Sequence, residues 1–200
     1  MKIICLGRNY TQPNTIDTKS PEPIVFLKPD SSILKDGKPF FIPDFAKDFE
    51  YEGELVFRIN RLGKNISERF AHRYYDAVTV GMDLMATDML SDATQNKLPW
   101  DLSKGFDGSA VLGDFIPVDN LGVKNLRFSV RMHNEVLQRG NSADLVWSID
   151  QIIAYVSKYY TLKIGDFIFT GAPQASKRLE VGQTLEGYLE DKKVLNLDIR

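Results

Sequence analysis

Two acidic side chains at alternate positions, Glu52 and Glu54, are the first candidates for chemistry in this sequence. They lie in a segment with strand character, 51–59, where side chains at i and i+2 point to the same face. Two carboxylates held together repel each other, and a divalent cation between them removes that repulsion. Gly53 would let another segment approach the strand closely. The pattern predicts a metal site, with two solvated glutamates on an exposed strand as the plainer alternative.

Asp83 is a third acidic residue in an unusual place, because it interrupts the apolar segment 80–86. An ionised carboxylate in a protein core is costly unless it is paired with a cation or bound to a metal. A salt bridge to an arginine or lysine is therefore the alternative for this residue. Three carboxylates, with waters or substrate oxygens completing the sphere, suit Mg²⁺ or Mn²⁺ better than zinc. Such a site leaves room for a substrate that chelates through two oxygens.

Two further positions could serve an anionic substrate. Lys104 lies between Trp100 and Phe106, so its ammonium could face an enclosed centre and stabilise an enolate there. Most lysines are simply solvated, and that alternative stays open. Thr170 and Gly171 end an apolar strand, where the hydroxyl and nearby backbone amides could hold a carboxylate or form a plain turn.

Strands dominate the elements that must position these residues. The stretch 10–23 has three prolines and no strand or helix period, so it is a loop and a candidate lid. Because helices are few and do not alternate with the strands, an α+β fold with a mainly antiparallel or mixed sheet is favoured. The sequence predicts strands at 2–6, 24–28, 51–59, 78–85 and 167–170, a hairpin at 126–138 turning at His133-Asn134, and helices from Ser67 to about Tyr75 or Ala77, at 88–97 and at 149–159 after Ser148.

The composition excludes several classes of protein. With one cysteine among 200 residues, the chain has no intrachain disulfide and no cysteine-based zinc module. Its two histidines exclude a three-histidine metal site, so carboxylates must supply most ligands of any bound metal. The net charge of -2 does not suggest nucleic-acid binding. No apolar run approaches a membrane span, and we expect a cytoplasmic protein without a targeting segment.

Taken together and in order, these motifs resemble the fumarylacetoacetate hydrolase family. The resemblance is closest to its short acylpyruvase-like and 2-hydroxyhepta-2,4-diene-1,7-dioate isomerase-like members, and it spans nearly the whole chain. The segments that carry it are 5–10 (CLGRNY), 23–29 (PIVFLKP), 52–54 (EGE), 81–83 (GMD), 98–106 (LPW to KGF) and 152–171 with its Gly-Asp and T-G-x-P turns.

The resemblance implies a mixed β-sandwich roll of the α+β class, forming a single catalytic domain over 1–200. Residues 1–45 would provide N-terminal strands and the lid-like loop, and 46–200 the metal-binding core. It also implies a homodimer that acts on a small 2-oxo acid or its enol. The net charge and the lack of a long apolar run predict no nucleic-acid or membrane partner. The implied residues are Glu52, Glu54 and Asp83 as ligands of Mg²⁺ or Mn²⁺, Lys104 as a catalytic residue, and Arg8, Asn9, Lys28 and Thr170 as substrate-binding residues.

The sequence departs from the family in the lid. Hydrolytic members carry a histidine and a glutamate just after the first motif, where they activate water, whereas 11–17 has no histidine here. Neither His72 nor His133 lies at a corresponding place, and both are expected to be surface or structural residues. Asp17 or Glu22 in the same loop is a candidate substitute for the missing base.

A second departure follows Asp83. Thr87 and Leu90 stand where members often have an arginine and a glutamine, although Asp88 between them matches.

The leading expectation is a Mg²⁺- or Mn²⁺-dependent enzyme that hydrolyses a C–C bond of an acylpyruvate-type substrate. A 2-oxo acid decarboxylase or keto–enol isomerase is the closest alternative, because decarboxylation needs electron withdrawal by the metal but no activated water. A catalytically weak protein that binds 2-oxo acids and a strand pair without metal are the remaining alternatives.

Overall fold

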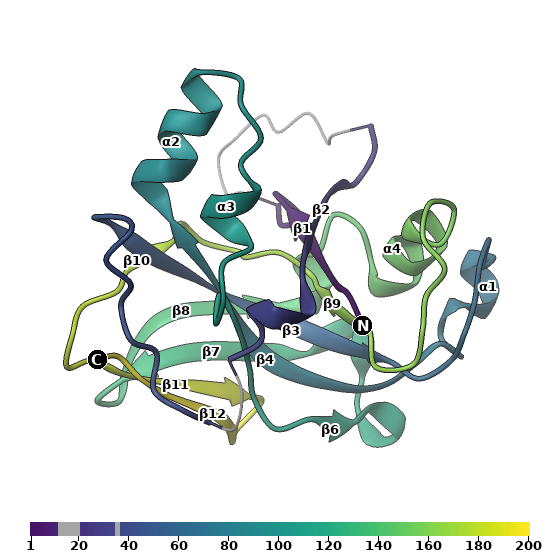
Figure 1. The fold of residues 1–200 in the computed structure, drawn as a ribbon. Helices are drawn as coiled ribbons and strands as arrows, with labels where there is room; N and C mark the ends of the chain where they lie inside the picture. The colour runs from purple at the N-terminus through teal and green to yellow at the C-terminus, as the bar shows by residue number, and fades with distance from the viewer. Residues whose placement is uncertain (12–20, 35–36) are drawn as a thin grey trace.

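Two β-sheets form most of the structure, a computed structural model that describes residues 1–11, 21–34 and 37–200 (Figure 1). The larger sheet contains β1 (Ile3–Gly7), β2 (Ile24–Lys28), β3 (Phe49–Ile59), β4 (Tyr75–Ala86), β5 (Ala110–Leu112), β6 (Ile116–Pro117), β9 (Phe167–Phe169) and β10 (Lys177–Arg178). The smaller sheet contains β7 (Arg127–Met132), β8 (Glu135–Asn141), β11 (Thr184–Leu189) and β12 (Lys192–Asp198). The helices are α1 (Glu68–Ala71), α2 (Thr87–Gln95), α3 (Asp101–Lys104) and α4 (Ile149–Val156), with 3-10 turns η1 (Asp30–Ser32), η2 (Val118–Asn120), η3 (Val123–Asn125) and η4 (Ser142–Asp144).

The strand order confirms the predicted α+β fold with mixed sheets. The larger sheet runs β2-β1-β9-β3-β4-β5, with β10 paired to β3 and β6 to β4, and the smaller runs β12-β11-β7-β8. Of the pairings in the larger sheet, β1 with β9 is parallel and the others between named strands are antiparallel. Figure 1 shows α2 and α3 on one side of the larger sheet and the smaller sheet on the other.

The two faces of β3 have different surroundings, and this difference positions the site. Tyr51, Leu55 and Phe57 face the main hydrophobic core between the sheets. Gly53 shares that face, and a Cβ there would lie 2.5 Å from Val130 Cγ2 of β7. The absence of a side chain thus lets the smaller sheet approach β3, as the sequence predicts. The alternate positions of β3, including both candidate glutamates, face the opposite side.

Most predicted elements are present, with changes at their ends. The β7–β8 hairpin turns at His133 and Asn134, whose φ angles of 47° and 67° suit a tight two-residue turn. Ser148 precedes α4, as predicted, and forms a reciprocal capping box with Gln151, although the helix ends at Val156.

The helix predicted from Ser67 to about Tyr75 or Ala77 is wrong in length. It ends at Ala71, and the Ser67 side chain makes no capping hydrogen bond. The physical reason is that Tyr75 already pairs with Ile59 of β3, so the chain must leave the helix before it. None of the helices among the described residues is long and apolar enough to cross a membrane.

Candidate active site

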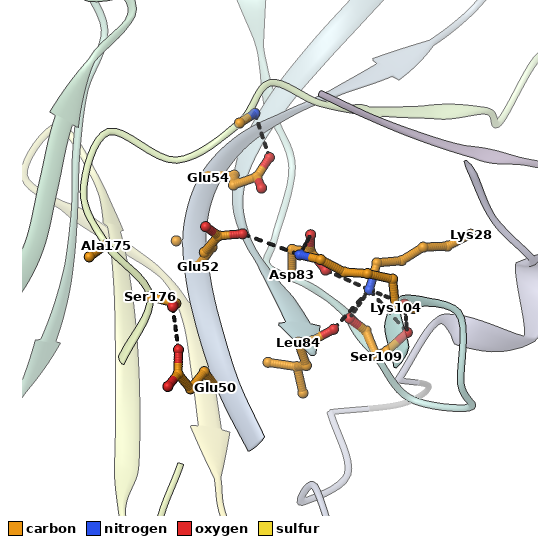
Figure 2. Close-up of polar contacts among 12 residues, drawn as sticks. Lys28, Glu50, Glu52, Glu54, Asp83, Leu84, Lys104, Ser109, Ala175 and Ser176 are labelled. Atoms are coloured by element: carbon orange, nitrogen blue, oxygen red, sulfur yellow. Dashed lines mark hydrogen bonds and ion pairs between the residues drawn. The ribbon is translucent and has the colours of Figure 1, made fainter. Parts of the chain in front are cut away.

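Glu52, Glu54 and Asp83 form an acidic cluster on one face of the β3–β4 pair (Figure 2). The antiparallel register places Glu52 directly opposite Asp83, and Glu54 follows two residues along the same face. One ligand oxygen from each carboxylate lies within 4.8 Å of the others. Glu54 and Asp83 are buried, whereas the Glu52 side chain is 28% exposed. The cluster therefore opens toward solvent only through Glu52.

Asp83 is held in its ionised form by two lysines. Its Oδ1 lies 2.5 Å from Lys28 Nζ, and its Oδ2 lies 2.8 Å from Lys104 Nζ. Burial alone would raise the pKa of Asp83, but the two ammonium groups bring it below the ordinary value. The salt-bridge alternative from the sequence is thus present in the structure, and it coexists with the acidic cluster.

The two glutamates have the opposite electrostatic situation. Burial raises the pKa of Glu54 well above its ordinary value, and the charges of Asp83 and Glu52 add to the effect. The Gly171 amide, which donates to Glu54 Oε2 over 2.6 Å, opposes it only in part. Burial also raises the pKa of Glu52, against the attraction of Lys104. All the ligand atoms of the cluster are oxygens, and each carboxylate charge disfavours the ionisation of the neighbouring glutamates. Such a donor set fits a hard divalent cation.

Lys104, on α3, contacts the acidic cluster and also lines the cavity described below. Its Nζ donates to Asp83 and, over 3.3 Å, to Glu52, and lies 5.3 Å from the centre of the Phe26 ring. Burial lowers the pKa of Lys104, but Asp83 and Glu52 raise it above the ordinary value, so the amine stays protonated. The short helix α3, which presents this residue, has no signal in the sequence periodicity.

Lys28 is fully buried behind Asp83. Besides the ion pair, its ammonium donates to the carbonyl oxygens of Leu84 at 3.0 Å, Lys104 at 2.5 Å and Ser109 at 2.9 Å. These bonds attach the segment around α3 to β4 and so fix the backbone of Lys104. Lys28 does not line the cavity described below, and its predicted contact with substrate stays a prediction.

Asn9 and Thr170 hold the turn after β9. Asn9 Nδ2 donates to the Thr170 carbonyl oxygen over 2.9 Å, and the Thr170 hydroxyl donates to the Leu55 carbonyl oxygen over 3.0 Å. Gly171 has a φ of +91°, which favours glycine, and its amide binds Glu54. The carboxylate held by this turn is therefore one of the protein's own. The substrate contacts predicted for Asn9 and Thr170 stay predictions.

A cavity of about 610 Å³ lies against the exposed side of the acidic cluster. A volume in this range is typical of sites for small molecules. Arg8, which follows β1 and is exposed, is its second cation beside Lys104 among the described residues. The described lining residues are Leu6, Gly7, Arg8, Ile24, Phe26, Glu52, Met85, Leu90, Thr94, Trp100, Lys104, Ala172, Gln174 and Ala175.

Neither histidine lies at this cavity. His72 lines a separate cavity with Tyr75 and Asp150, and His133 lies in the β7–β8 turn. Of the two candidate substitute bases, Asp17 lies outside the described residues, and Glu22 accepts a hydrogen bond from the Tyr155 hydroxyl over 2.9 Å. Most of the predicted lid likewise falls outside the described part of the chain.

Sequence reasoning missed Gln138 of β8. Its side-chain oxygen accepts from the Gly53 amide at 2.8 Å, and its nitrogen donates to the Ala175 carbonyl oxygen at 2.9 Å. It thereby ties the cavity segment near Ala175 to β3, between the two glutamates. A buried polar residue in a strand was the available signal, but the residues it bonds are distant in sequence.

The family model for the fumarylacetoacetate (FAA) hydrolase C-terminal region matches residues 2–200. The chain belongs to the fumarylacetoacetate hydrolase family. Among curated members, the chain is 30% identical to the mitochondrial oxaloacetate tautomerase of Rattus norvegicus, covering 94% of this chain and 86% of the relative. It is 33% identical to the mitochondrial oxaloacetate decarboxylase of Dictyostelium discoideum, covering 92% and 87%.

Solved structures of family members agree with the fold. Fumarylpyruvate hydrolase from Pseudomonas aeruginosa, in complex with Mn²⁺ and pyruvate, superposes with a TM-score of 0.90 at 26% identity. The match covers 100% of this chain and 89% of that one. The family's enzymes thus include a tautomerase, a decarboxylase and a hydrolase, all named for small acids.

Proposed function

We propose that this protein is a divalent-metal-dependent enzyme that interconverts the keto and enol forms of small 2-oxo acids. The observation that carries the proposal is the acidic cluster beside the protonated Lys104, at one end of an open cavity. A tautomerase among the relatives supports the choice of reaction.

Glu52, Glu54 and Asp83 would hold the metal, with Mg²⁺ and Mn²⁺ both suited to three carboxylates. A cation bound there would act as a Lewis acid toward the carboxylate and 2-oxo oxygens of the substrate. The Mn²⁺ and pyruvate in the related fumarylpyruvate hydrolase support both the metal and the class of ligand.

The chain's own residues would favour the charge that develops during the reaction. In ketonisation the substrate loses the proton of its 2-hydroxyl group and gains one at C3, and negative charge is shared by O2 and C3 between these events. Lys104 holds a proton at Nζ and places positive charge beside this centre. Arg8 lines the same cavity, and its predicted contact with substrate stays a prediction.

Hydrolysis of an acylpyruvate is the second candidate. It gains support from the similarity to fumarylpyruvate hydrolase. It requires an activated water, and no histidine lines the cavity among the described residues, which is why we place it second. Decarboxylation needs no such water but does need a carboxylate on C3 of the substrate, and the decarboxylase among the relatives supports that variant.

The test is an assay of the Mg²⁺- and Mn²⁺-loaded protein with a panel of 2-oxo acids. We expect the enol absorbance to decrease faster with metal-loaded protein than without metal. The product should be the keto form, with the same molecular composition as the starting acid. Chromatography of the products separates the alternatives, because hydrolysis of an acylpyruvate gives pyruvate and a second acid, and decarboxylation gives CO₂. Turnover of none of the panel by metal-loaded protein would contradict the proposal and favour the weakly catalytic binding protein.

Three expectations remain predictions: the homodimer, the single domain over 1–200 with its N-terminal part at 1–45, and the cytoplasmic location. The curated relatives named above are mitochondrial, so the location needs a direct measurement.

A further inference from the structure

The cavity has a side that the proposed reaction does not use. Phe26, Met85, Leu90 and Trp100 form this side, which we call the apolar wall. We propose that the apolar wall selects 2-oxo acids whose far end is an uncharged, apolar group over dicarboxylic ones such as oxaloacetate. This inference rests on the proposed function, because the acidic cluster and Lys104 must hold the 2-oxo acid end.

The apolar wall begins directly at the reactive end of the cavity. Phe26 and Trp100 pack edge to face with ring centres 5.2 Å apart, and Lys104 Nζ lies 5.3 Å from the Phe26 ring. Met85 follows Asp83 by two residues on β4, so both side chains lie on the same face of the strand. A substrate held at the cluster would therefore have its next carbons against apolar side chains.

Among the described residues, few cations near the cavity are left for a second substrate carboxylate. Lys104 is bound to Asp83 and Glu52, and Lys28 is buried behind them. The remaining cation of the described lining is Arg8, which is exposed at the end of β1. Placing an unpaired carboxylate against the apolar wall would be costly, whereas an alkyl or aryl group gains from leaving water there.

Leu90 is the one residue of the apolar wall that α2 contributes, and it lines the cavity. A leucine offers no hydrogen-bond donor to a substrate carboxylate, and it extends the surface formed by Met85. Leu90→Gln is therefore the variant that most directly tests the proposal.

The experiment compares keto–enol turnover of phenylpyruvate and oxaloacetate by Mn²⁺-loaded protein. We expect kcat/KM for phenylpyruvate to exceed that for oxaloacetate by about tenfold or more, in the range that apolar contacts provide. Leu90→Gln should lower this ratio severalfold. Leu102→Gln is the matched control, because Leu102 on α3 is 76% exposed and does not line the cavity, and its ratio should stay at the parent value.

Inhibition by the same compounds separates this inference from the proposed function. Competition with Mn²⁺-dependent binding of oxalate, followed calorimetrically, measures affinity without turnover. Tighter binding of phenylpyruvate without turnover supports the apolar wall and contradicts the tautomerase. Preference for oxaloacetate in either measurement overturns the inference. If Arg8→Gln then removes that preference, Arg8 is the cation that binds the second carboxylate of oxaloacetate. Failure of both compounds to bind would overturn both proposals.

Discussion

The acidic cluster and the apolar wall lie at one cavity but are built in different ways. The cluster comes from two neighbouring strands, β3 and β4, whose register fixes all three carboxylates at once. The apolar wall draws on four separate segments: β2, the end of β4, α2 and the residue before α3. A change in α2 or at Trp100 alters no residue of the two strands that carry the cluster. These two segments could therefore vary with the substrate while the residues proposed for the reaction stay the same.

The largest effect is expected from breaking the cluster itself. Glu54→Gln should lower metal-dependent kcat/KM by about 10³-fold or more, because a buried ligand charge is lost. It should also remove the rise in melting temperature on adding Mn²⁺. Glu50→Gln is the matched control, since Glu50 lies on the same strand face but binds the Ser176 hydroxyl outside the cluster (Figure 2). Equal behaviour of the two variants would contradict the metal assignment.

Lys104 lies where the acidic cluster and the apolar wall meet. Its removal should have opposite effects on turnover and on metal affinity. Lys104→Met should lower kcat by about 10²-fold, as for loss of one group that stabilises developing charge. The same change should raise Mn²⁺ affinity, because a cation 2.8 Å from Asp83 is removed. Isothermal titration with Mn²⁺ and steady-state kinetics measure the two effects. Lys97→Met, at an exposed residue in the turn after α2, controls for the change in net charge. Weaker metal binding by Lys104→Met would contradict this account.

The close packing of the smaller sheet against β3 can be tested at Gly53. Gly53→Ala should destabilise the protein by about 1–3 kcal/mol, because its Cβ would meet Val130 Cγ2 at 2.5 Å. Urea denaturation measures this free energy of unfolding. Gly122→Ala is the control, since a Cβ there has no atom within 4 Å. Equal stability of the two variants would show that the smaller sheet does not need the close approach.

The pH dependence of stability follows from Glu54. Its pKa is raised by burial in the folded, metal-free protein, whereas an unfolded glutamate titrates at about 4.3. At pH values between these two pKa values, the folded state binds more protons than the unfolded state. The contribution of Glu54 to the free energy of unfolding therefore falls as pH rises. The prediction is the sign of this change, a fall in stability as pH rises through the interval between the two pKa values. Mn²⁺ should abolish it, since the metal binds the ionised form and releases protons.

Thermal denaturation of metal-free protein across this pH range measures the effect, with Glu54→Gln as the reference. The lowered pKa of Asp83 acts in the opposite direction but only at lower pH, as its stabilisation is lost when pH falls through that value. Stability that rises with pH in the parent relative to Glu54→Gln would contradict the prediction.

The smallest effect is expected in the wall. Phe26→Leu should lower kcat/KM for phenylpyruvate about fivefold, in line with the worth of one aromatic contact. The value for a 2-oxo acid with no tail should hardly change. Phe41→Leu, at a 68% exposed phenylalanine, is the control. An equal loss for both substrates would place Phe26 in the reaction rather than in selection.

The acidic cluster was predictable in part, because the alternation of side chains along a single strand is local. Alternation along β3 places Glu52 and Glu54 together, and an acidic residue inside an apolar strand identified Asp83. The wall was not predictable in this way, since its four segments meet only through the tertiary fold. The role of Gly171 was also missed, because a turn amide that binds a carboxylate does not reveal whose carboxylate it is.

Element ends were less predictable than element types. The helix after Ser67 ends early because pairing of β4 with β3 extends to Tyr75, which helical propensity does not reveal. Lys28 illustrates the same limit for side chains. Its place in a motif predicts a contact with substrate, which stays a prediction, but the sequence did not reveal that its ammonium binds Asp83 and three carbonyl oxygens.

The pairing of Glu52 with Asp83 has a consequence for how this chain can vary in length. Side chains alternate between the two faces of a strand, so inserting or deleting one residue within β3 or β4 would turn part of the cluster toward the main core. A change in length between Asn60 and Tyr74, where the two strands are joined, leaves that pairing intact. We therefore expect length variation among relatives to be concentrated in this connection and absent from the two strands.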